Sequence, residues 1–271
     1  MKLPRTYLFV PADRPERFAK AMSSGADAVV LDLEDAVAPA AKDAARASVA
    51  AWLAGANERG RVVVRINDQS TPWFEDDLAL LAHLAKAGAA AVMLTKAERV
   101  DTIARVCAAC PGVAVLALVE TARGMLAAQA LAAAPGVQRL VFGTIDYALD
   151  LDLGTDPAAL DAGHAHLALV SRAAGIAAPV AGVTTALDDE ALLLADLARA
   201  RTHGFGAKLC IHPRQVAPIH AALAPSADEL LWAQRVLAAA DGAHGAVQLD
   251  GRMIDKPVIE RARRLVARAA R

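Results

Sequence analysis

Two acidic residues, Glu120 and Asp146, each come at or just after the end of a short apolar run, Val113–Val119 and Gln138–Gly143. Carboxylate oxygens are the ligands that a hard divalent cation prefers, and two of them leave coordination positions for water and for substrate oxygens. If the two runs are neighbouring parallel strands, their carboxyl ends meet at one edge of a sheet. The pattern therefore predicts that Glu120 and Asp146 hold Mg²⁺.

Other charged side chains follow apolar runs in the same way. Arg65 lies near the end of Arg61–Ile66, Lys96 follows Ala90–Thr95, and the acidic group Asp32-Leu33-Glu34-Asp35 closes another run. A guanidinium group offers a permanent, forked cation to a carboxylate or to an enolate oxygen. A salt bridge that only stabilises the protein is the alternative for Arg65.

The elements that must position these residues are eight apolar, β-branched runs, each followed by a stretch with helical spacing. The predicted strands are Thr6–Val10, Ala28–Leu33, Arg61–Ile66, Ala90–Thr95, Val113–Val119, Gln138–Gly143, Pro179–Val183 and Ala207–Ile211. Eight such units favour a closed α/β barrel, the (β/α)₈ or TIM barrel, whose functional groups lie at the strand ends. A doubly wound open sheet is the alternative, but no Gly-x-Gly-x-x-Gly follows the first strand.

The chain continues beyond the eighth unit. Helical patterns over Arg214–Ala222 and Ser226–Asp241 precede a Gly-bounded segment, GAVQLDGRMID, and a final basic helix over Pro257–Arg271. We therefore expect a barrel domain over residues 1–224 and an extension over residues 225–271. The extension is expected to be a helical and hairpin lid or a contact between subunits.

Composition narrows the classes of partner. The 271 residues carry a formal net charge of −1 and a pI near 6.7, which argues against nucleic acid and anionic membranes as partners. The longest uncharged stretches, such as Gly124–Gln138, have only 15 residues, whereas a membrane span needs about 20. The first residues lack the apolar segment of a secretion signal, and three cysteines fit a reducing compartment. We expect a cytoplasmic protein.

These residues together resemble a known family. The segments are RTYLFVPADRPERFAKAMSSGADAVVLDLEDAV, VVVRIN, VMLTKAE, ALVETARGM, FGTIDYALDL, GAKLCIHPRQV and DGRMIDKPV, in that order. Over nearly its whole length the chain is similar to the citrate lyase beta-subunit-like proteins of the HpcH/HpaI aldolase/citrate lyase superfamily. VLDLEDAV and KLCIHPRQV are the specific matches.

The resemblance implies a Mg²⁺-dependent carbon–carbon lyase with a (β/α)₈ fold that forms trimers or hexamers. Its substrates would be 3-hydroxy-acid thioesters of coenzyme A, such as citramalyl-, malyl- or citryl-CoA, or of an acyl carrier protein. The matched Glu120 and Asp146 would hold Mg²⁺ at the substrate, and Arg65 would contact the substrate during catalysis. Asp255 would be an acid that the lid brings to a neighbouring subunit's site.

Further roles follow from the substrate class. Coenzyme A carries phosphates, so the expected cations are Arg14 first, with Arg17 and Lys20, and then Lys96, with Arg123 and Arg214. Glu34 and Asp35 are expected to assist catalysis by orienting metal-bound water or basic partners. A helix cap or a salt bridge is the alternative for these two carboxylates.

Two positions depart from the family's common pattern. Ile145 stands where members commonly have Glu in Gly-x-Glu-Asp, and Thr95 stands where they commonly have Pro in Leu-Pro-Lys. The choice of substrate is therefore open. Two alternative functions are a malyl-CoA-type thioesterase and a weakly catalytic subunit of a citrate-lyase-like complex.

Overall fold

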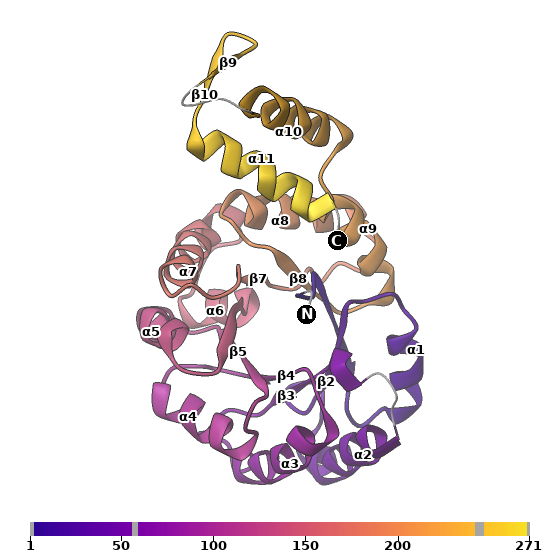
Figure 1. Ribbon diagram of the computed structural model, residues 1–271. Helices are drawn as coiled ribbons and strands as arrows, with labels where there is room; N and C mark the ends of the chain where they lie inside the picture. The colour runs from indigo at the N-terminus through magenta and orange to yellow at the C-terminus, as the bar shows by residue number, and fades with distance from the viewer. Residues whose placement is uncertain (1–2, 56–58, 242–246, 270–271) are drawn as a thin grey trace. The chain divides into compact units, whose positions relative to one another are not determined.

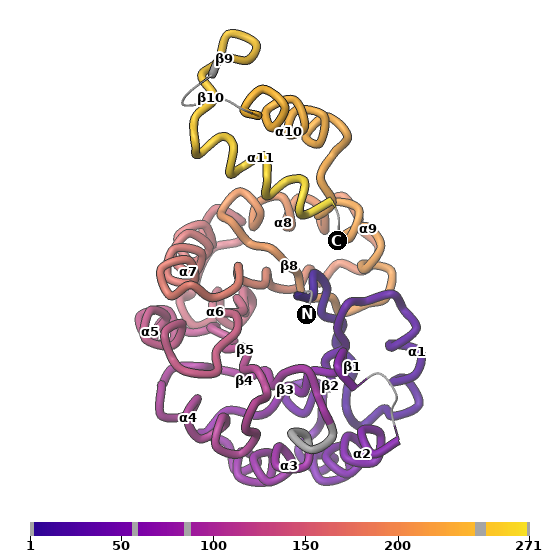
Figure 2. Tube along the Cα trace, in the orientation of Figure 1, coloured from indigo at the N-terminus to yellow at the C-terminus, as the bar shows by residue number. Residues whose placement is uncertain are grey.

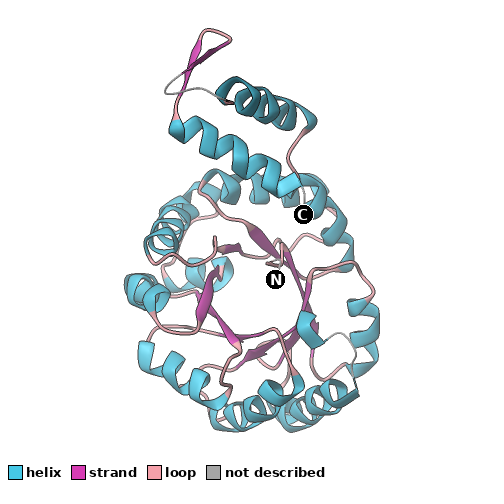
Figure 3. Cartoon of the chain, viewed as in Figure 1, coloured by secondary structure: helices cyan, strands magenta, loops and turns pink. Residues whose placement is uncertain are grey.

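The computed structural model describes residues 3–55, 59–241 and 247–269. These residues form two compact units, one over Pro4–Ile219 and a second that comprises Leu3 and the described residues from His220 onward. The first unit is a closed barrel of eight parallel strands in sequential order, β1 to β8, surrounded by helices (Figures 1 and 3). The predicted TIM barrel is confirmed, whereas the functional division at residue 224 stays a prediction.

The strands match the apolar runs of the sequence, and all but one lie within a residue of their predicted bounds. They are β1 Thr6–Pro11, β2 Ala28–Asp32, β3 Val62–Ile66, β4 Ala91–Leu94, β5 Ala114–Val119, β6 Val137–Phe142, β7 Val180–Ala181 and β8 Ala207–Cys210. The exception is β7. The carbonyl of Gly182 accepts a hydrogen bond from Lys208 Nζ, and that of Thr184 accepts one from Gln215 Nε2, so side chains replace the strand ladder there.

Helices follow the strands around the barrel, as the tube in Figure 2 traces. In the first unit they are α1 Phe18–Met22, α2 Lys42–Gly55, α3 Phe74–Ala87, α4 Val100–Ala109, α5 Ala122–Ala133, α6 Thr144–Asp150, α7 Asp161–Ala173 and α8 Glu190–Thr202, with α9 Val216–Leu223 following β8. None of the helices in the described ranges is both long enough and apolar enough to cross a membrane.

The two-residue period of the strands decides which side chains enter the barrel. Val30 on β2, Val63 on β3 and Leu118 on β5 belong to the buried cluster inside the barrel. Two residues further along each strand, the same face carries Asp32, Arg65 and Glu120. The apolar pattern that builds the core therefore also aims these charged groups into the carboxyl-terminal mouth.

The second unit has a small core of its own. Helices α10 (Ala227–Ala240) and α11 (Lys256–Ala269) pack together, and an antiparallel hairpin of β9 (Val247–Leu249) and β10 (Arg252–Ile254) joins them. The buried cluster comprises Ala233, Val236, Ile254, Ala262 and Leu265. The predicted helices and hairpin of the extension are thus present.

Candidate active site at the barrel mouth

A cavity of about 530 Å³ opens at the carboxyl ends of the strands. Its charged lining consists of Asp32, Asp35, Arg65, Glu120 and Asp146, which come from the carboxyl ends of β2, β3 and β5 and from the first turn of α6. Its apolar lining includes Phe9, Leu118, Ile145, Val183 and Leu209. The structure therefore brings the predicted metal ligands and the predicted substrate cation into one cavity.

Arg65 is held from two sides by carboxylates. Its Nε and one terminal nitrogen bind Asp32 Oδ1 and Oδ2 at 2.7 and 2.5 Å, and its other terminal nitrogen lies 2.8 Å from Glu34 Oε2. The guanidinium group also packs over the Phe9 ring, 4.8 Å from its centroid. Burial disfavours the charged form of the guanidinium group. The carboxylates of Asp32 and Glu34 outweigh this effect of burial and raise the pKa of Arg65. Each terminal nitrogen has a second N–H.

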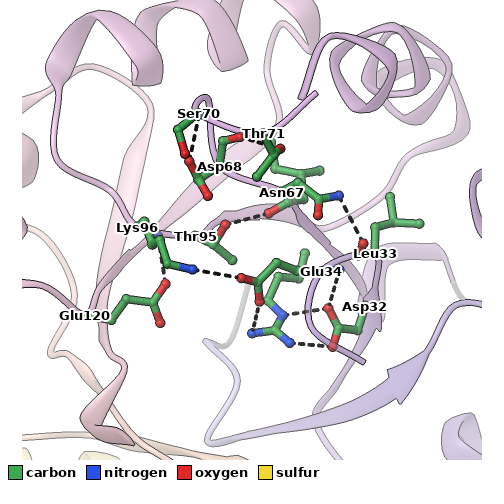
Figure 4. Close-up of polar contacts among 12 residues, drawn as sticks. Asp32, Leu33, Glu34, Asn67, Asp68, Ser70, Thr71, Thr95, Lys96 and Glu120 are labelled. Atoms are coloured by element: carbon green, nitrogen blue, oxygen red, sulfur yellow. Dashed lines mark hydrogen bonds and ion pairs between the residues drawn. The ribbon is translucent and has the colours of Figure 1, made fainter. Parts of the chain in front are cut away.

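Glu34 connects Arg65 to the next strand. Its Oε1 lies 3.3 Å from Nζ of Lys96, and Figure 4 shows Glu34 reaching toward the Lys96 side chain. Burial of the carboxyl group raises the pKa of Glu34, although Arg65 acts in the opposite direction. Burial also opposes the charge of Lys96, but the carboxylates of Glu34 and Glu120 outweigh this effect and raise its pKa. Glu34 therefore contacts two basic side chains, and its predicted role in catalysis stays a prediction.

Lys96 has an uncommon backbone conformation, with φ of 42°. Such left-handed torsion costs about 1–2 kcal/mol for a residue with a side chain. It accompanies a hydrogen bond from the backbone N–H of Lys96 to Oε1 of Glu120, at 2.8 Å. This bond fixes one oxygen of Glu120 at the edge of the mouth.

Glu120 is buried, and burial is the main reason why its pKa is raised to about 8; the charges of Asp146 and Glu34 raise it further. A Cβ atom at Gly143 would collide with its carboxyl group, so glycine is needed there. A cation between Glu120 and Asp146 would relieve the repulsion between the two carboxylates. The donor set is all oxygen, which suits Mg²⁺. Within the described ranges, no group of three or more His, Cys, Asp or Glu residues forms a fuller metal site.

Sequence analysis missed a buried lysine that supports this arrangement. Lys42 Nζ donates hydrogen bonds to the carbonyls of Leu33 and Glu34 and to Asn67 Oδ1, at 2.6–2.8 Å. Asn67 in turn donates to the buried Asp77. These bonds fix the loop that carries Glu34. A lysine in the first turn of an amphipathic helix gives no sequence signal of this role.

Asp32 ends β2 and lines the cavity, although it is not among the site residues that the sequence predicts. Its register partner on β3 is Arg65, which places the two side chains next to each other on the same face. Opposite charges at adjacent strand ends are the signal that could have identified this ion pair. The ion pair that was considered as an alternative for Arg65 is therefore present, and contact of Arg65 with substrate stays a prediction.

Three of the predicted site residues lie outside the buried charged contacts of the barrel mouth. Asp35 is exposed on the cavity lining, and Arg14 is exposed in the loop after β1. Asp255 lies in the second unit, where its Oδ1 accepts a hydrogen bond from the backbone N–H of Val258 at the start of α11. Its approach to a barrel mouth stays a prediction.

Comparisons with known proteins find two matching families and several similar proteins. The family described as HpcH/HpaI aldolase/citrate lyase matches residues 5–213, and one described as C–C bond lyase of the TIM-barrel fold matches residues 167–271. The chain is 40% identical to a citrate lyase subunit beta-like protein of Mycobacterium tuberculosis, covering 97% of this chain and 94% of that one. It is 35% identical to a (3S)-malyl-CoA thioesterase of Cereibacter sphaeroides, with 98% and 94% covered.

A crystal structure is similar over the whole chain. It is that of the protein CitE from Mycobacterium tuberculosis in complex with magnesium, acetoacetate and coenzyme A. The TM-score is 0.85 at 35% sequence identity, and the match covers 98% of both chains.

Because the pKa of Glu120 is raised, Glu120→Gln should change the stability of the metal-free protein by an amount that depends on pH. Between pH 4.5 and about 8 the folded protein keeps a proton that the unfolded chain has released, so wild-type stability falls as pH rises through this window. Glutamine does not titrate and keeps the acceptor for Lys96. With EDTA at pH 8.5 the variant should be more stable by roughly 1–3 kcal/mol, and the gain should shrink toward pH 5. Thermal unfolding measures this, with the exposed Glu16→Gln as control; a destabilised variant at pH 8.5 would contradict it.

The forked contact of Arg65 with Asp32 predicts that lysine cannot replace it. Arg65→Lys keeps the charge but leaves part of the buried Asp32 carboxylate without a donor, which should lower the free energy of unfolding by about 2–4 kcal/mol. Urea denaturation measures the change. Arg17 is exposed, so the control variant Arg17→Lys should leave the free energy of unfolding unchanged. Equal stabilities of Arg65→Lys and wild type would show that the fork is not needed.

Proposed function

Because the chain belongs to the HpcH/HpaI aldolase/citrate lyase family, we propose that it is a Mg²⁺-dependent lyase that cleaves a 3-hydroxy-acid thioester of the citramalyl-, malyl- or citryl-CoA type. The products would be a 2-keto acid or oxaloacetate and an acyl-CoA. The observation that supports this most is that Glu120 and Asp146 line the same cavity as Arg65, which is bound by two carboxylates. Magnesium and coenzyme A in the similar crystal structure support it.

In this proposal Glu120 and Asp146 hold Mg²⁺. The ion would supply a Lewis acid for the hydroxyl and the emerging keto group of the substrate. Lys96 positions Glu120 through its backbone N–H, so one carboxylate oxygen has a fixed direction before substrate arrives. The apolar wall of Leu118, Val183 and Leu209 limits the water around this position.

Arg65 would stabilise the thioester enolate that forms when the carbon–carbon bond breaks. Asp32 and Glu34 hold the guanidinium group from two sides, and the second N–H of each terminal nitrogen can donate to the thioester oxygen. Such preorganised donors contribute a few kcal/mol to catalysis because they need no reorientation during the reaction. Glu34 is therefore a positioning residue in this scheme, and Asp35 adds negative charge near it.

The enolate carbon also needs a proton, and Asp255 is the proposed donor. It would act from the second unit of a neighbouring subunit in a homotrimer or hexamer. The large exposed side chains of Leu126 on α5, Leu149 on α6 and Leu169 on α7 support an interface between copies of the chain. Arg14, with Arg17 and Lys20, is the proposed cation group for the phosphates of coenzyme A, and an acyl carrier protein is the alternative carrier.

Thioester hydrolysis is the second candidate function. The (3S)-malyl-CoA thioesterase relative favours it, since that protein matches 98% of the chain. Both reactions use the same cavity, but they differ in product. Lysis gives a keto acid and an acyl-CoA, whereas hydrolysis gives an intact hydroxy acid and free coenzyme A.

Product analysis with a panel of citramalyl-, malyl- and citryl-CoA tests the proposed function. We expect a keto acid and an acyl-CoA, formed only with Mg²⁺, and a loss of at least about 10³-fold in turnover for Asp146→Asn because the metal loses a ligand. Asp150→Asn, four residues further along the same helix, is the matched control. A hydroxy acid and free coenzyme A would select hydrolysis, and full activity of Asp146→Asn would refute the metal assignment.

A second experiment tests Asp255 separately. Asp255→Asn should lose about 10²–10⁴-fold in turnover while thioester binding changes little. Exchange of the acetyl-CoA methyl protons with deuterated water, in the presence of a keto-acid analogue, should slow to the same extent. Exchange at the wild-type rate would assign the proton transfer to another group, with Glu34 as the next candidate.

A further inference from the structure

A second cavity of about 500 Å³ lies outside the barrel wall, between the end of β7 and helices α6, α7 and α8. Much of its lining is apolar, including Ala148, Leu153, Leu160, Ala181 and Leu192. Thr144, Ile145 and Val183 line both this cavity and the one at the barrel mouth. The two cavities therefore share a wall.

Lys208 lies at the base of this second cavity. Its neighbours Ala207 and Leu209 face the barrel interior, so the alternation of β8 sends Lys208 to the opposite side. The side chain is buried, and its Nζ donates one hydrogen bond, to the carbonyl of Gly182 at 2.9 Å. Within the described ranges Lys208 forms no ion pair with a carboxylate, although the charge of Asp196 acts on it. Two of the three ammonium N–H groups are thus left for another acceptor.

The other charged or titratable groups that line the same cavity are Asp156, His164 on α7, and Asp196 and Arg199 on α8. Arg199 is paired with Asp161, whereas Asp196 bonds to a neutral side chain. Its Oδ2 accepts a hydrogen bond from Thr184 at 2.5 Å, which leaves Oδ1 as a further acceptor. Burial lowers the pKa of Lys208 to about 8, and the charge of Asp196 opposes this effect. Lys208 is therefore mostly charged at neutral pH, and a buried charge without a close partner destabilises the fold until it is paired.

We propose that the second cavity binds a hydroxy acid with a short alkyl chain. The carboxylate would accept hydrogen bonds from Lys208, the hydroxyl would donate to Asp196 Oδ1, and the chain would lie against Leu153, Leu160 and Leu192. The hydroxyl distinguishes this ligand from a plain carboxylic acid, because only the hydroxyl can donate a hydrogen bond to Oδ1 of Asp196. A ligand there also touches Ile145 and Val183, which face the barrel mouth.

Calorimetric titration of the full-length protein with 3-hydroxyhexanoate tests the proposal. EDTA is present, so the carboxylates at the barrel mouth hold no metal that could bind the acid. We expect one saturable site, with at least about tenfold weaker binding of hexanoate, which lacks the hydroxyl, and of hexane-1,3-diol, which lacks the carboxylate. No saturable binding, or equal binding of all three compounds, would overturn the proposal.

Two variants locate the site. Leu192 and Leu187 are 41% and 46% exposed, but only Leu192 lines the cavity. Leu192→Trp should therefore fill the cavity and weaken binding at least about tenfold, whereas Leu187→Trp should bind as wild type does. Equal binding by both tryptophan variants would place the ligand elsewhere and refute the proposal.

Lys208 supplies an independent test. Lys208→Met should weaken binding at least about tenfold, and thermal unfolding verifies that the variant is folded. In the wild type, binding should weaken as pH rises past about 8, because the neutral amine no longer attracts the carboxylate. Binding that is constant from pH 6.5 to pH 9.5 would exclude Lys208 as the anchor, whether or not Lys208→Met folds.

Discussion

The ion pair between Arg65 and Asp32 is the interaction on which the barrel mouth depends. It joins β2 to β3 where both strands end, and its charges are almost fully withdrawn from water. Two charges in such a place are stable only when their geometry is good and their remaining hydrogen-bonding groups are satisfied. The bidentate contact, the second carboxylate of Glu34 and the Phe9 ring provide these conditions.

Further charged contacts continue around the mouth from this pair. Glu34 contacts Lys96, and the backbone of Lys96 fixes Glu120, so strands β2 to β5 are linked in order by alternating charges. Negative charge accumulates at the far end, where the charge of Asp146 helps to raise the pKa of Glu120. This surplus of carboxylate at a position that faces the cavity is what a divalent cation would balance. The same contacts leave one further N–H on each terminal nitrogen of Arg65, which lines the cavity.

The sequence predicted the barrel well because strand burial depends on local, repeated patterns. Apolar runs gave seven of the eight strands to within one residue, and β7 was too long in the prediction because Lys208 and Gln215, distant in sequence, take its carbonyls. The site residues at strand ends followed from the same pattern. Lys42 and Asn67 could not be predicted, since their bonds depend on how α2 packs on a loop rather than on spacing in the chain. The proposed approach of Asp255 to the barrel mouth of a neighbouring subunit stays a prediction, because it would require assembly of several chains.

In the proposed function, the two carboxylates at the barrel mouth form one metal site beside Arg65. A crystal structure with Mn²⁺ replacing Mg²⁺, with data collected at a wavelength where manganese scatters anomalously, tests this most directly. The account predicts one anomalous peak about 2.1–2.2 Å from a carboxylate oxygen of both Glu120 and Asp146, with Arg65 still bound to Asp32. A peak that contacts only one of these carboxylates, or none at the barrel mouth, would contradict it.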